Sequence, residues 1–259
     1  MIYTINTYKR PTKQITLSNL PQSINDKTWL VVQHSERDLY HKIHDKLIVL
    51  PPWITNLTDT RQWMIEEFSG EPLLVMDDDL RFNVRREGKY DKLYKPTEEE
   101  VCEMFHTIER MVSEEVPFVG VSRREGNNRQ PSDLVYNTRI AQMWAVHTPT
   151  IKQQGYRFDR TRTKEDMDMI LQILDGGRRN LCLYKWAVEG GNSNSEGGCS
   201  SYRTHELMKE DAEKFASLWP GIVKVVEKET KSSWGGGVRH DVRVQWKKAY
   251  RSENLRRGG

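Results

Sequence analysis

The chain has 259 residues, of which 30% are charged and 36% apolar, and its formal net charge is +3. This length allows one large domain, or one domain with an appendage. No apolar run approaches the ~20 residues that a membrane helix needs. The first residues lack a basic segment followed by an apolar one, and the cysteines are odd in number and widely spaced. We therefore expect no signal peptide, no membrane contact, no cysteine zinc site and a cytoplasmic location.

Strand and helix signals alternate through the first part of the chain. Short β-leaning runs cover residues 2–8, 29–33 and 46–50, and a helical pattern over 58–68 precedes a fourth apolar run at 73–76. Strands separated by helical patterns imply a mostly parallel sheet. The sequence therefore predicts an α/β fold.

Two amphipathic helices mark the middle of the chain. The first follows Thr97, which forms a capping-box pattern with Glu100, and the second covers residues 163–174. Strands are expected at 118–121, 139–146 and 181–188, and a helix at 206–219. A half-buried strand with a basic outer face is expected at 238–246. Loops are expected at 123–133 and at 190–201, and the loop at 190–201 is expected to act as a lid.

The most informative stretch is residues 73–82, Leu-Leu-Val-Met-Asp-Asp-Asp-Leu-Arg-Phe. The apolar run predicts a buried strand, and ligands of open α/β sheets bind outside the carboxyl ends of the strands. Asp77 and Asp79 point the same way on an extended segment. Two carboxylates on one side suit Mg²⁺ or Mn²⁺, and through the metal a substrate diphosphate. An acidic turn that caps the strand end is an equal alternative.

A second acidic cluster, Glu165-Asp166-Met167-Asp168, stands at the start of the helix expected over 163–174. Thr163 and Asp166 fit a helix cap, and acids in the first turn suit the helix dipole. The alternative is that one carboxylate is the general base that deprotonates an acceptor hydroxyl. The two interpretations are compatible because the cap needs only one acid.

The C-terminal part, from Lys224 on, is rich in Lys and Arg with aromatic residues between them. Such a segment can contact phosphates while its rings stack on bases, although a solvated chain end explains the composition equally well. We expect a main domain over residues 1–225 and a basic extension over 226–259.

The order of these features resembles a GT-A type glycosyltransferase. Residues 3–11, Tyr-Thr-Ile-Asn-Thr-Tyr-Lys-Arg-Pro, resemble the opening strand of that fold, whose end holds the nucleotide base. Asp77-Asp78-Asp79 resembles its D-x-D motif, and residues 165–168 followed by Gly176-Gly177 resemble its E-D motif at the acceptor site. The resemblance covers roughly residues 1–190. It implies a Rossmann-like α/β sandwich with a mostly parallel central sheet, and a basic C-terminal extension packed on or near the acceptor side.

The resemblance also implies roles for individual residues. Asp166 is the expected catalytic base, with Glu165 as second choice, and one base on the acceptor side favours inversion. Asp79 and Asp77 are the expected ligands of Mn²⁺ or Mg²⁺, with His205 or His240 as candidates to complete the shell. The donor is expected to contact Thr7, Tyr8, Arg10, Arg61, Asp77 and Asp78.

Two departures from the GT-A pattern are visible. The second strand of that family usually ends in an acidic residue for the base, whereas this chain has Gln33-His34-Ser35-Glu36. The lipid- and cellulose-type members carry a Q-x-x-R-W motif, which residues 190–201 do not match. Recognition of the donor base is therefore left open.

A narrower resemblance concerns the layout of the whole chain. Its compact size, acidic motifs, Gly/Ser loop and basic extension look like phage-encoded glycosyltransferases associated with TET-like dioxygenases, which are thought to add a sugar to 5-hydroxymethylcytosine in phage DNA. This resemblance implies a UDP-sugar donor, DNA as acceptor, action in the host cytoplasm and no obligate protein partner. DNA contacts are then expected from Arg123, Arg124, Arg129, Arg239, Arg243 and Lys247.

Three alternatives remain at this stage. The same transfer could act on a polysaccharide or a protein. A nucleotidyltransferase usually carries a Gly-rich loop after its first strand, where this chain has residues 9–13, Lys-Arg-Pro-Thr-Lys. A non-enzymatic nucleic-acid-binding module leaves both acidic motifs unexplained. We therefore predict metal-dependent sugar transfer to a hydroxyl, with 5-hydroxymethylcytosine in DNA as the favoured acceptor.

Overall fold

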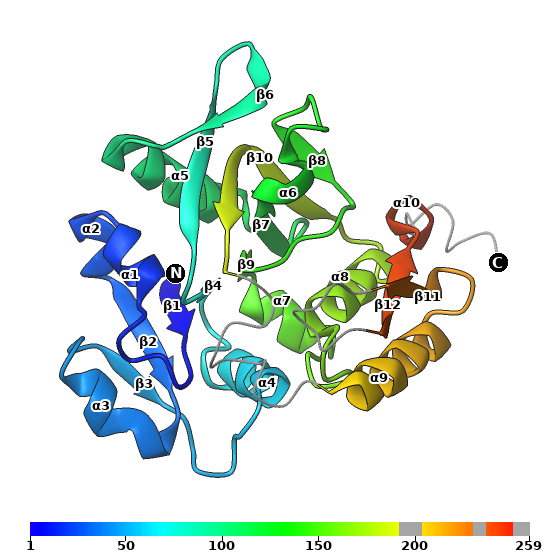
Figure 1. Ribbon diagram of the computed structural model, residues 1–259, viewed down its shortest axis with the longest axis horizontal. Helices are drawn as coiled ribbons and strands as arrows, with labels where there is room; N and C mark the ends of the chain where they lie inside the picture. The colour runs from blue at the N-terminus through cyan, green and yellow to red at the C-terminus, as the bar shows by residue number, and fades with distance from the viewer. Residues whose placement is uncertain (192–203, 230–236, 251–259) are drawn as a thin grey trace.

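The computed structural model describes residues 1–191, 204–229 and 237–250. These residues form a ten-stranded mixed sheet with helices against it, and a separate two-stranded hairpin near the C-terminus (Figure 1). The sheet order is β3-β2-β1-β4-β9-β7-β10-β5-β6, with β8 paired to β10. No helix among the described residues is long and apolar enough to cross a membrane.

The first half of the sheet is built from parallel strands joined by helices. Its strands are β1 (Ile2–Asn6), β2 (Thr28–Val32), β3 (Leu47–Val49) and β4 (Leu73–Asp77). The connecting helices are α1 (Ile15–Asn19), α2 (Gln22–Asn25), the 3-10 turn His34–Glu36, α3 (Arg37–His41) and α4 (Leu57–Glu67). Because β1 pairs in parallel with both β2 and β4, the carboxyl ends of these strands meet at one edge.

The second half mixes parallel and antiparallel strands. Its strands are β5 (Arg81–Arg86), β6 (Lys89–Tyr94), β7 (Phe118–Arg123), β8 (Leu134–Tyr136), β9 (Met143–Val146) and β10 (Asn180–Glu189). Its helices are α5 (Glu98–Met111), α6 (Arg124–Asn127), α7 (Thr148–Gln153) and α8 (Glu165–Asp175). Only β9 separates β4 from β7, and it runs antiparallel to both. Strands β4, β7 and β10 therefore point the same way, and the predicted α/β class with a mostly parallel central sheet is confirmed.

Strand β4 shows how the sequence builds the two core layers. Leu74 and Met76 pack into the cluster that also contains β1 and α5 side chains. Leu73 and Val75 pack into the opposite cluster, with residues of α4 and α8. Because successive side chains of a strand point to opposite faces, an uninterrupted apolar run requires both faces to be covered.

Two predicted segments differ from the structure. The strand expected over 139–146 begins only at Met143, because Gln142 has a φ of 70° that no extended strand accommodates. The loop expected over 123–133 contains the short helix α6. The hairpin β5–β6 was not expected, because β6 is largely exposed and its charged residues give no apolar alternation.

The C-terminal segment forms helix α9 (His205–Leu218), the hairpin of β11 (Val223–Glu229) and β12 (Val238–Val244), and α10 (Trp246–Ala249). The half-buried strand expected over 238–246 ends at Val244, because Trp246 begins α10. Val242, Val244 and Trp246 pack against the α8 side of the core. The boundary predicted after residue 225 falls inside β11, and the division into domain and extension stays a prediction. Most of the expected loop at 190–201 lies outside the described residues.

Candidate active site

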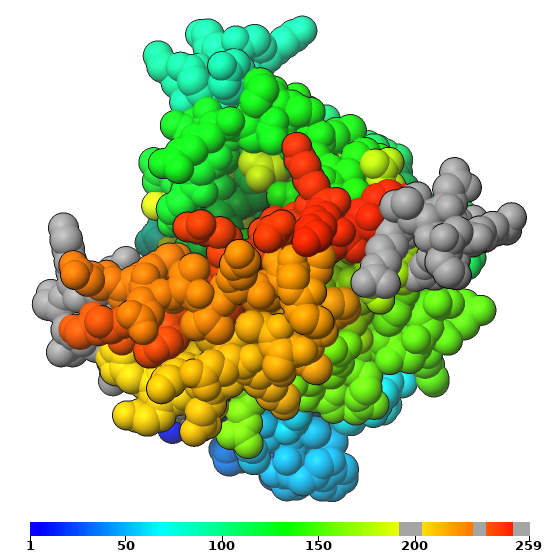
Figure 2. Space-filling view, turned by 90° about the vertical axis from the view of Figure 1, so that its right-hand side faces the viewer, coloured from blue at the N-terminus to red at the C-terminus, as the bar shows by residue number. Residues whose placement is uncertain are grey.

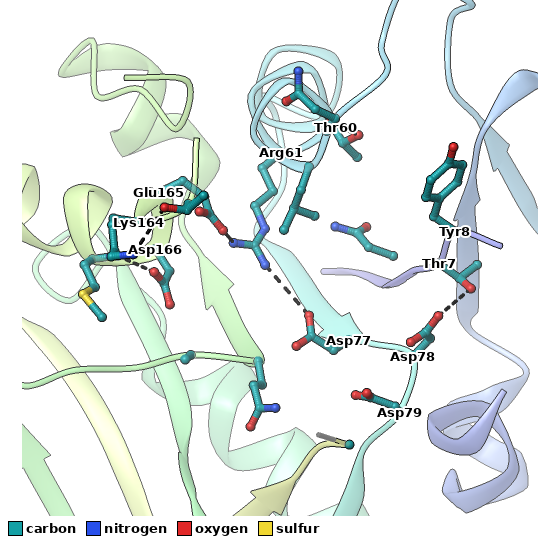
Figure 3. A pocket seen from close by; sticks show the side chains of 18 of the residues that line it. Thr7, Tyr8, Thr60, Arg61, Asp77, Asp78, Asp79, Lys164, Glu165 and Asp166 are labelled. Atoms are coloured by element: carbon teal, nitrogen blue, oxygen red, sulfur yellow. Dashed lines mark hydrogen bonds and ion pairs between the residues drawn. The ribbon is translucent and has the colours of Figure 1, made fainter. Parts of the chain in front are cut away.

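A cavity of about 500 Å³ opens at the carboxyl ends of β1 and β4. This is the edge at which open α/β sheets bind ligands. Its walls come from the loop after β1, the start of α4, the end of β4 and the start of α8 (Figure 3), and also from the hairpin β11–β12. Sequence-predicted residues on these walls are Thr7, Tyr8, Arg10, Arg61, Asp77, Asp78, Asp79, Arg123, Glu165, Asp166 and Arg239.

Asp78 is turned away from its two neighbours in the acidic run. Its carboxylate accepts hydrogen bonds from Thr7 Oγ1 at 2.7 Å and from Arg10 Nη1 at 2.8 Å. Only 4% of the residue is exposed, and this burial raises the pKa of Asp78 although Thr7 and Arg10 oppose the rise. Asp78 therefore fixes the loop after β1 against the end of β4, and Thr7 and Arg10 are held in place by it.

Arg61 lies between the two acidic motifs. Its guanidinium forms a buried ion pair with Glu165, lies 3.9 Å from Asp77 Oδ1, and stacks 5.1 Å from the centre of the Trp144 ring. Figure 3 shows Arg61 between Glu165 and Asp77, with Asp78 directed toward Thr7. One arginine on α4 thus joins the end of β4 to the start of α8.

The three carboxylates at the end of β4 share two arginines, Arg10 and Arg61, and Glu165 also pairs with Arg61. Desolvation raises the pKa of Asp77 to about 7, although its side chain keeps 36% of its surface toward the cavity. Arg61 opposes this rise, whereas the charges of Asp79, Asp78 and Glu165 add to it. A divalent cation beside Asp77 and Asp79 would relieve this repulsion, so these two residues fit a metal ion.

The two predicted histidines do not lie on the cavity wall. His205 begins α9, and His240 Nε2 is 3.5 Å from Glu227 Oε1 across the hairpin. Among the described residues there is no group of three or more His, Cys, Asp or Glu side chains that could hold a metal ion. The structure therefore brings Asp77 and Asp79 together but not His205 or His240.

The start of α8 differs from the predicted cap. The helix begins at Glu165, and its N-cap residue Lys164 makes no capping hydrogen bond with its side chain. Thr163 instead donates its hydroxyl to Asp211 Oδ2 on α9 at 2.5 Å, so the cap predicted for Thr163 with Asp166 is wrong. Asp166 accepts the amide N–H of Met167 at 2.8 Å and lines the cavity. Of the two base candidates, Glu165 is paired with Arg61, which favours Asp166.

Asp168, the last acid of the cluster, faces away from the cavity. It is fully buried and accepts hydrogen bonds from Trp219 Nε1 at 2.6 Å and Gln172 Nε2 at 2.9 Å, with Arg160 Nε at 3.3 Å. Burial raises the pKa of Asp168 to about 6 against the effect of these partners. Asp168 therefore ties α8 to the end of α9.

The predicted DNA-contacting residues separate into two groups. Arg123 and Arg239 line the cavity. Arg124, Arg129, Arg243 and Lys247 do not line it, and Arg124 Nη1 is instead 2.5 Å from Glu189 Oε2. Arg243 lines a second cavity of about 300 Å³, whose wall also includes Met167 and Trp246. The two cavities share Arg139, Met167 and Lys228, so they adjoin each other.

Several residues that line the first cavity were not predicted from the sequence as site residues. The basic ones are Arg139, Lys164 and Lys228, and the amides are Asn6, Gln33, Asn56 and Gln142. Lys164 directly precedes the acidic cluster at 165–168, and this position could have identified it. Gln33 lies on the wall although it occupies the place where the GT-A resemblance leads one to expect an acid. The amides carry no charge pattern, and only the fold brings them to the cavity.

Comparison with known proteins gives one family match over most of the chain. The model of the family described as "TET-Associated Glycosyltransferase" matches residues 1–198. Two curated relatives, each named "Beta-glucosyl-HMC-alpha-glucosyl-transferase", come from Enterobacteria phages T6 and T2. Each is 24% identical over 207 residues, which are 74% of this chain and 72% of the relative.

Solved structures resemble the chain more weakly. S. aureus TarS 1–349 in complex with UDP-GlcNAc has a TM-score of 0.49 at 14% identity, covering 83% of this chain and 67% of that one. Glucosyl-3-phosphoglycerate synthase from Mycobacterium tuberculosis, in complex with Mn²⁺, UDP and phosphoglyceric acid, has a TM-score of 0.49 at 7% identity, covering 95% and 89%.

Proposed function

Because the chain belongs to the TET-associated glycosyltransferase family and is therefore a glycosyltransferase, we propose that it transfers a sugar from a UDP-sugar to 5-hydroxymethylcytosine in DNA, with the help of a divalent metal ion. The observation that carries this proposal is the single cavity that holds both acidic motifs. Asp77 and Asp79 lie at the end of one strand on its wall, and Asp166 lies in the first turn of the facing helix. A donor and an acceptor can therefore meet between them.

The donor diphosphate belongs at the end of β4 in this proposal. Asp77 and Asp79 would hold Mn²⁺ or Mg²⁺, and the diphosphate oxygens would complete its shell. The bound metal would supply positive charge to the leaving diphosphate. Arg10 and Arg61 stand beside these carboxylates and add positive charge to the same region.

Asp166 is the proposed general base. It would take the proton of the acceptor hydroxyl as that oxygen attacks the anomeric carbon and the bond to the diphosphate breaks. A base on the acceptor side suits a direct displacement, so we propose inversion at the anomeric carbon. Glu165 is less suited to be the base because its carboxylate forms an ion pair with Arg61.

DNA is the proposed acceptor because of the chemistry around the second cavity. Arg139 and Arg243 can contact phosphates there, and Trp246 offers a ring beside them. Figure 2 shows this face, where the orange to red C-terminal hairpin borders a hollow below the green segments around α6 and β8. The names of the phage relatives include HMC, and they also include the term beta-glucosyl. A base that already carries glucose is therefore a second acceptor to test.

A mass-spectrometric assay tests the proposal. The protein is mixed with Mn²⁺, several UDP-sugars and DNA that contains cytosine, 5-hydroxymethylcytosine or its β-glucosylated form, and nucleosides are analysed after digestion. The expected result is a hexose-sized gain on a hydroxymethylated substrate, lost in Asp79→Ala and kept in the exposed-carboxylate control Asp45→Ala. Release of UDP without a change in the DNA would contradict the acceptor. No consumption of any donor would contradict the whole proposal.

A further inference from the structure

Gln142 has a backbone conformation that glutamine rarely adopts. Its φ of 70° lies in the left-handed region, which costs energy for a residue with a side chain. The conformation directs its carbonyl oxygen to the backbone N–H of Asp77, which donates at 2.9 Å. Glycine would offer the same carbonyl at the same φ without strain. The backbone hydrogen bond therefore does not explain why a glutamine side chain stands here.

The side chain of Gln142 is also unsatisfied. It lines the cavity, and its Oε1 is buried without a hydrogen-bond partner. A buried acceptor without a partner destabilises a fold. The left-handed φ and the unpartnered Oε1 of Gln142 both cost stability, and this combination on a cavity wall points to a role for its amide toward a ligand.

The amide of Gln142 and the carboxylate of Asp79 converge beside Gly190. A Cβ placed on Gly190 would lie 2.1 Å from Gln142 Nε2 and 3.2 Å from Asp79 Oδ1. The amide donates hydrogen bonds and the carboxylate accepts them, whereas a hydroxyl group does both. A hydroxyl held between the two side chains would therefore be recognised by both.

From these observations we infer that Gln142 is a specificity-determining residue, which binds a hydroxyl of the donor's sugar together with Asp79. The inference rests on the proposed function, because Asp79 is proposed to stand beside the donor diphosphate. It adds a residue outside both acidic motifs, and it explains why position 190 is glycine. A side chain there would push the Gln142 amide away from Asp79.

Calorimetric titration with UDP and with UDP-glucose, UDP-galactose and UDP-N-acetylglucosamine tests this inference. Binding of UDP reports the donor site without the sugar, so the ratio of the two affinities isolates the sugar contacts. Gln142→Gly should keep the affinity for UDP and lose about tenfold in affinity for the sugar that the wild type prefers, the scale of one hydrogen bond. Gly190→Ala should give the same pattern.

Asn137 supplies a matched control. It also has a positive φ, of 54°, and a buried Oδ1 without a partner, but it does not line the cavity. Both Gln142→Gly and Asn137→Gly should unfold at or above the wild-type Tm, because each removes strain and an unsatisfied acceptor. Only Gln142→Gly should change the sugar preference.

Two results would overturn the inference. In the first, Gln142→Gly keeps the wild-type ratio of UDP-sugar to UDP affinity and the same preference among the three sugars; in that case Gln142 does not bind the sugar. The proposed function would stand. If the wild type binds neither UDP nor any UDP-sugar, the proposed donor site itself is wrong, and the inference fails with it.

Discussion

Arg61 and Glu165 form a buried ion pair that joins α4, the helix before β4, to the start of α8. Their side chains are 5% and 6% exposed. The two acidic motifs, 86 residues apart between Asp79 and Glu165 in the chain, are thus held at a fixed separation by one arginine. Each of the two charges loses its hydration on burial, and the attraction of the partner compensates for that loss.

Arg61→Met should therefore destabilise the protein by roughly 3–5 kcal/mol, the usual cost of removing one partner of a buried pair. The double variant Arg61→Met with Glu165→Gln should lose less than the sum of the two single variants, because the second change removes the uncompensated charge. Urea unfolding of all four proteins measures this coupling. Additive losses would show that the pair does not hold the two motifs together.

Asp166→Asn should lower the rate of sugar transfer by about 10²–10⁴, the range for losing a general base. Its affinity for the UDP-sugar should stay within error of the wild type, because Asp166 is proposed to act on the acceptor. Single-turnover rates and calorimetry separate the two effects. An asparagine variant that transfers sugar at the wild-type rate would move the base to another residue.

Some residues of this site can be predicted from the sequence, and others cannot. Asp77 and Asp79 follow an apolar run, and Asp166 lies in the first turn of an amphipathic helix, so local patterns place all three. The cap predicted at Thr163 is wrong because the Thr163 hydroxyl donates to Asp211. Asp211 is 48 residues further along the chain, and no local sequence pattern predicts this contact. Gln142 was missed for a related reason. Its role depends on a strained φ and on the approach of Gly190, and both are properties of the fold.

The same contrast holds for the fold. The parallel strands β1 to β4 were predicted because their apolar runs alternate with helical patterns, which is what a sheet covered on both faces requires. The hairpin β5–β6 gave no such signal. Its pairing with β10 is antiparallel and at the far end of the sheet, where an exposed strand tolerates charged residues.

Asp168 makes the stability depend on pH. Its pKa of about 6 in the fold lies above the ordinary value of 3.8, so the folded state holds this proton more tightly than the unfolded state. The stabilisation is complete below about pH 4 and is lost as the pH rises through 6, on the order of 3 kcal/mol in total. Asp168→Asn cannot titrate. The free energy of unfolding of the wild type relative to this variant should therefore fall between pH 4 and 7, as urea titrations can measure. A constant difference would contradict the raised pKa.

Arg139 and Arg243 line the second cavity, and the proposed function gives them phosphate contacts. Each phosphate contact that is lost should reduce the slope of log affinity against log salt by about 0.9 on duplex DNA. Arg139→Ala with Arg243→Ala should therefore lower the slope by about 1.8 and weaken DNA binding most at low salt. The exposed Arg110→Ala on α5, outside both cavities, is the control. Fluorescence anisotropy with a labelled hydroxymethylated duplex measures the slopes. If the double variant keeps the wild-type slope, DNA does not cross this face, and the acceptor must enter from another side of the cavity.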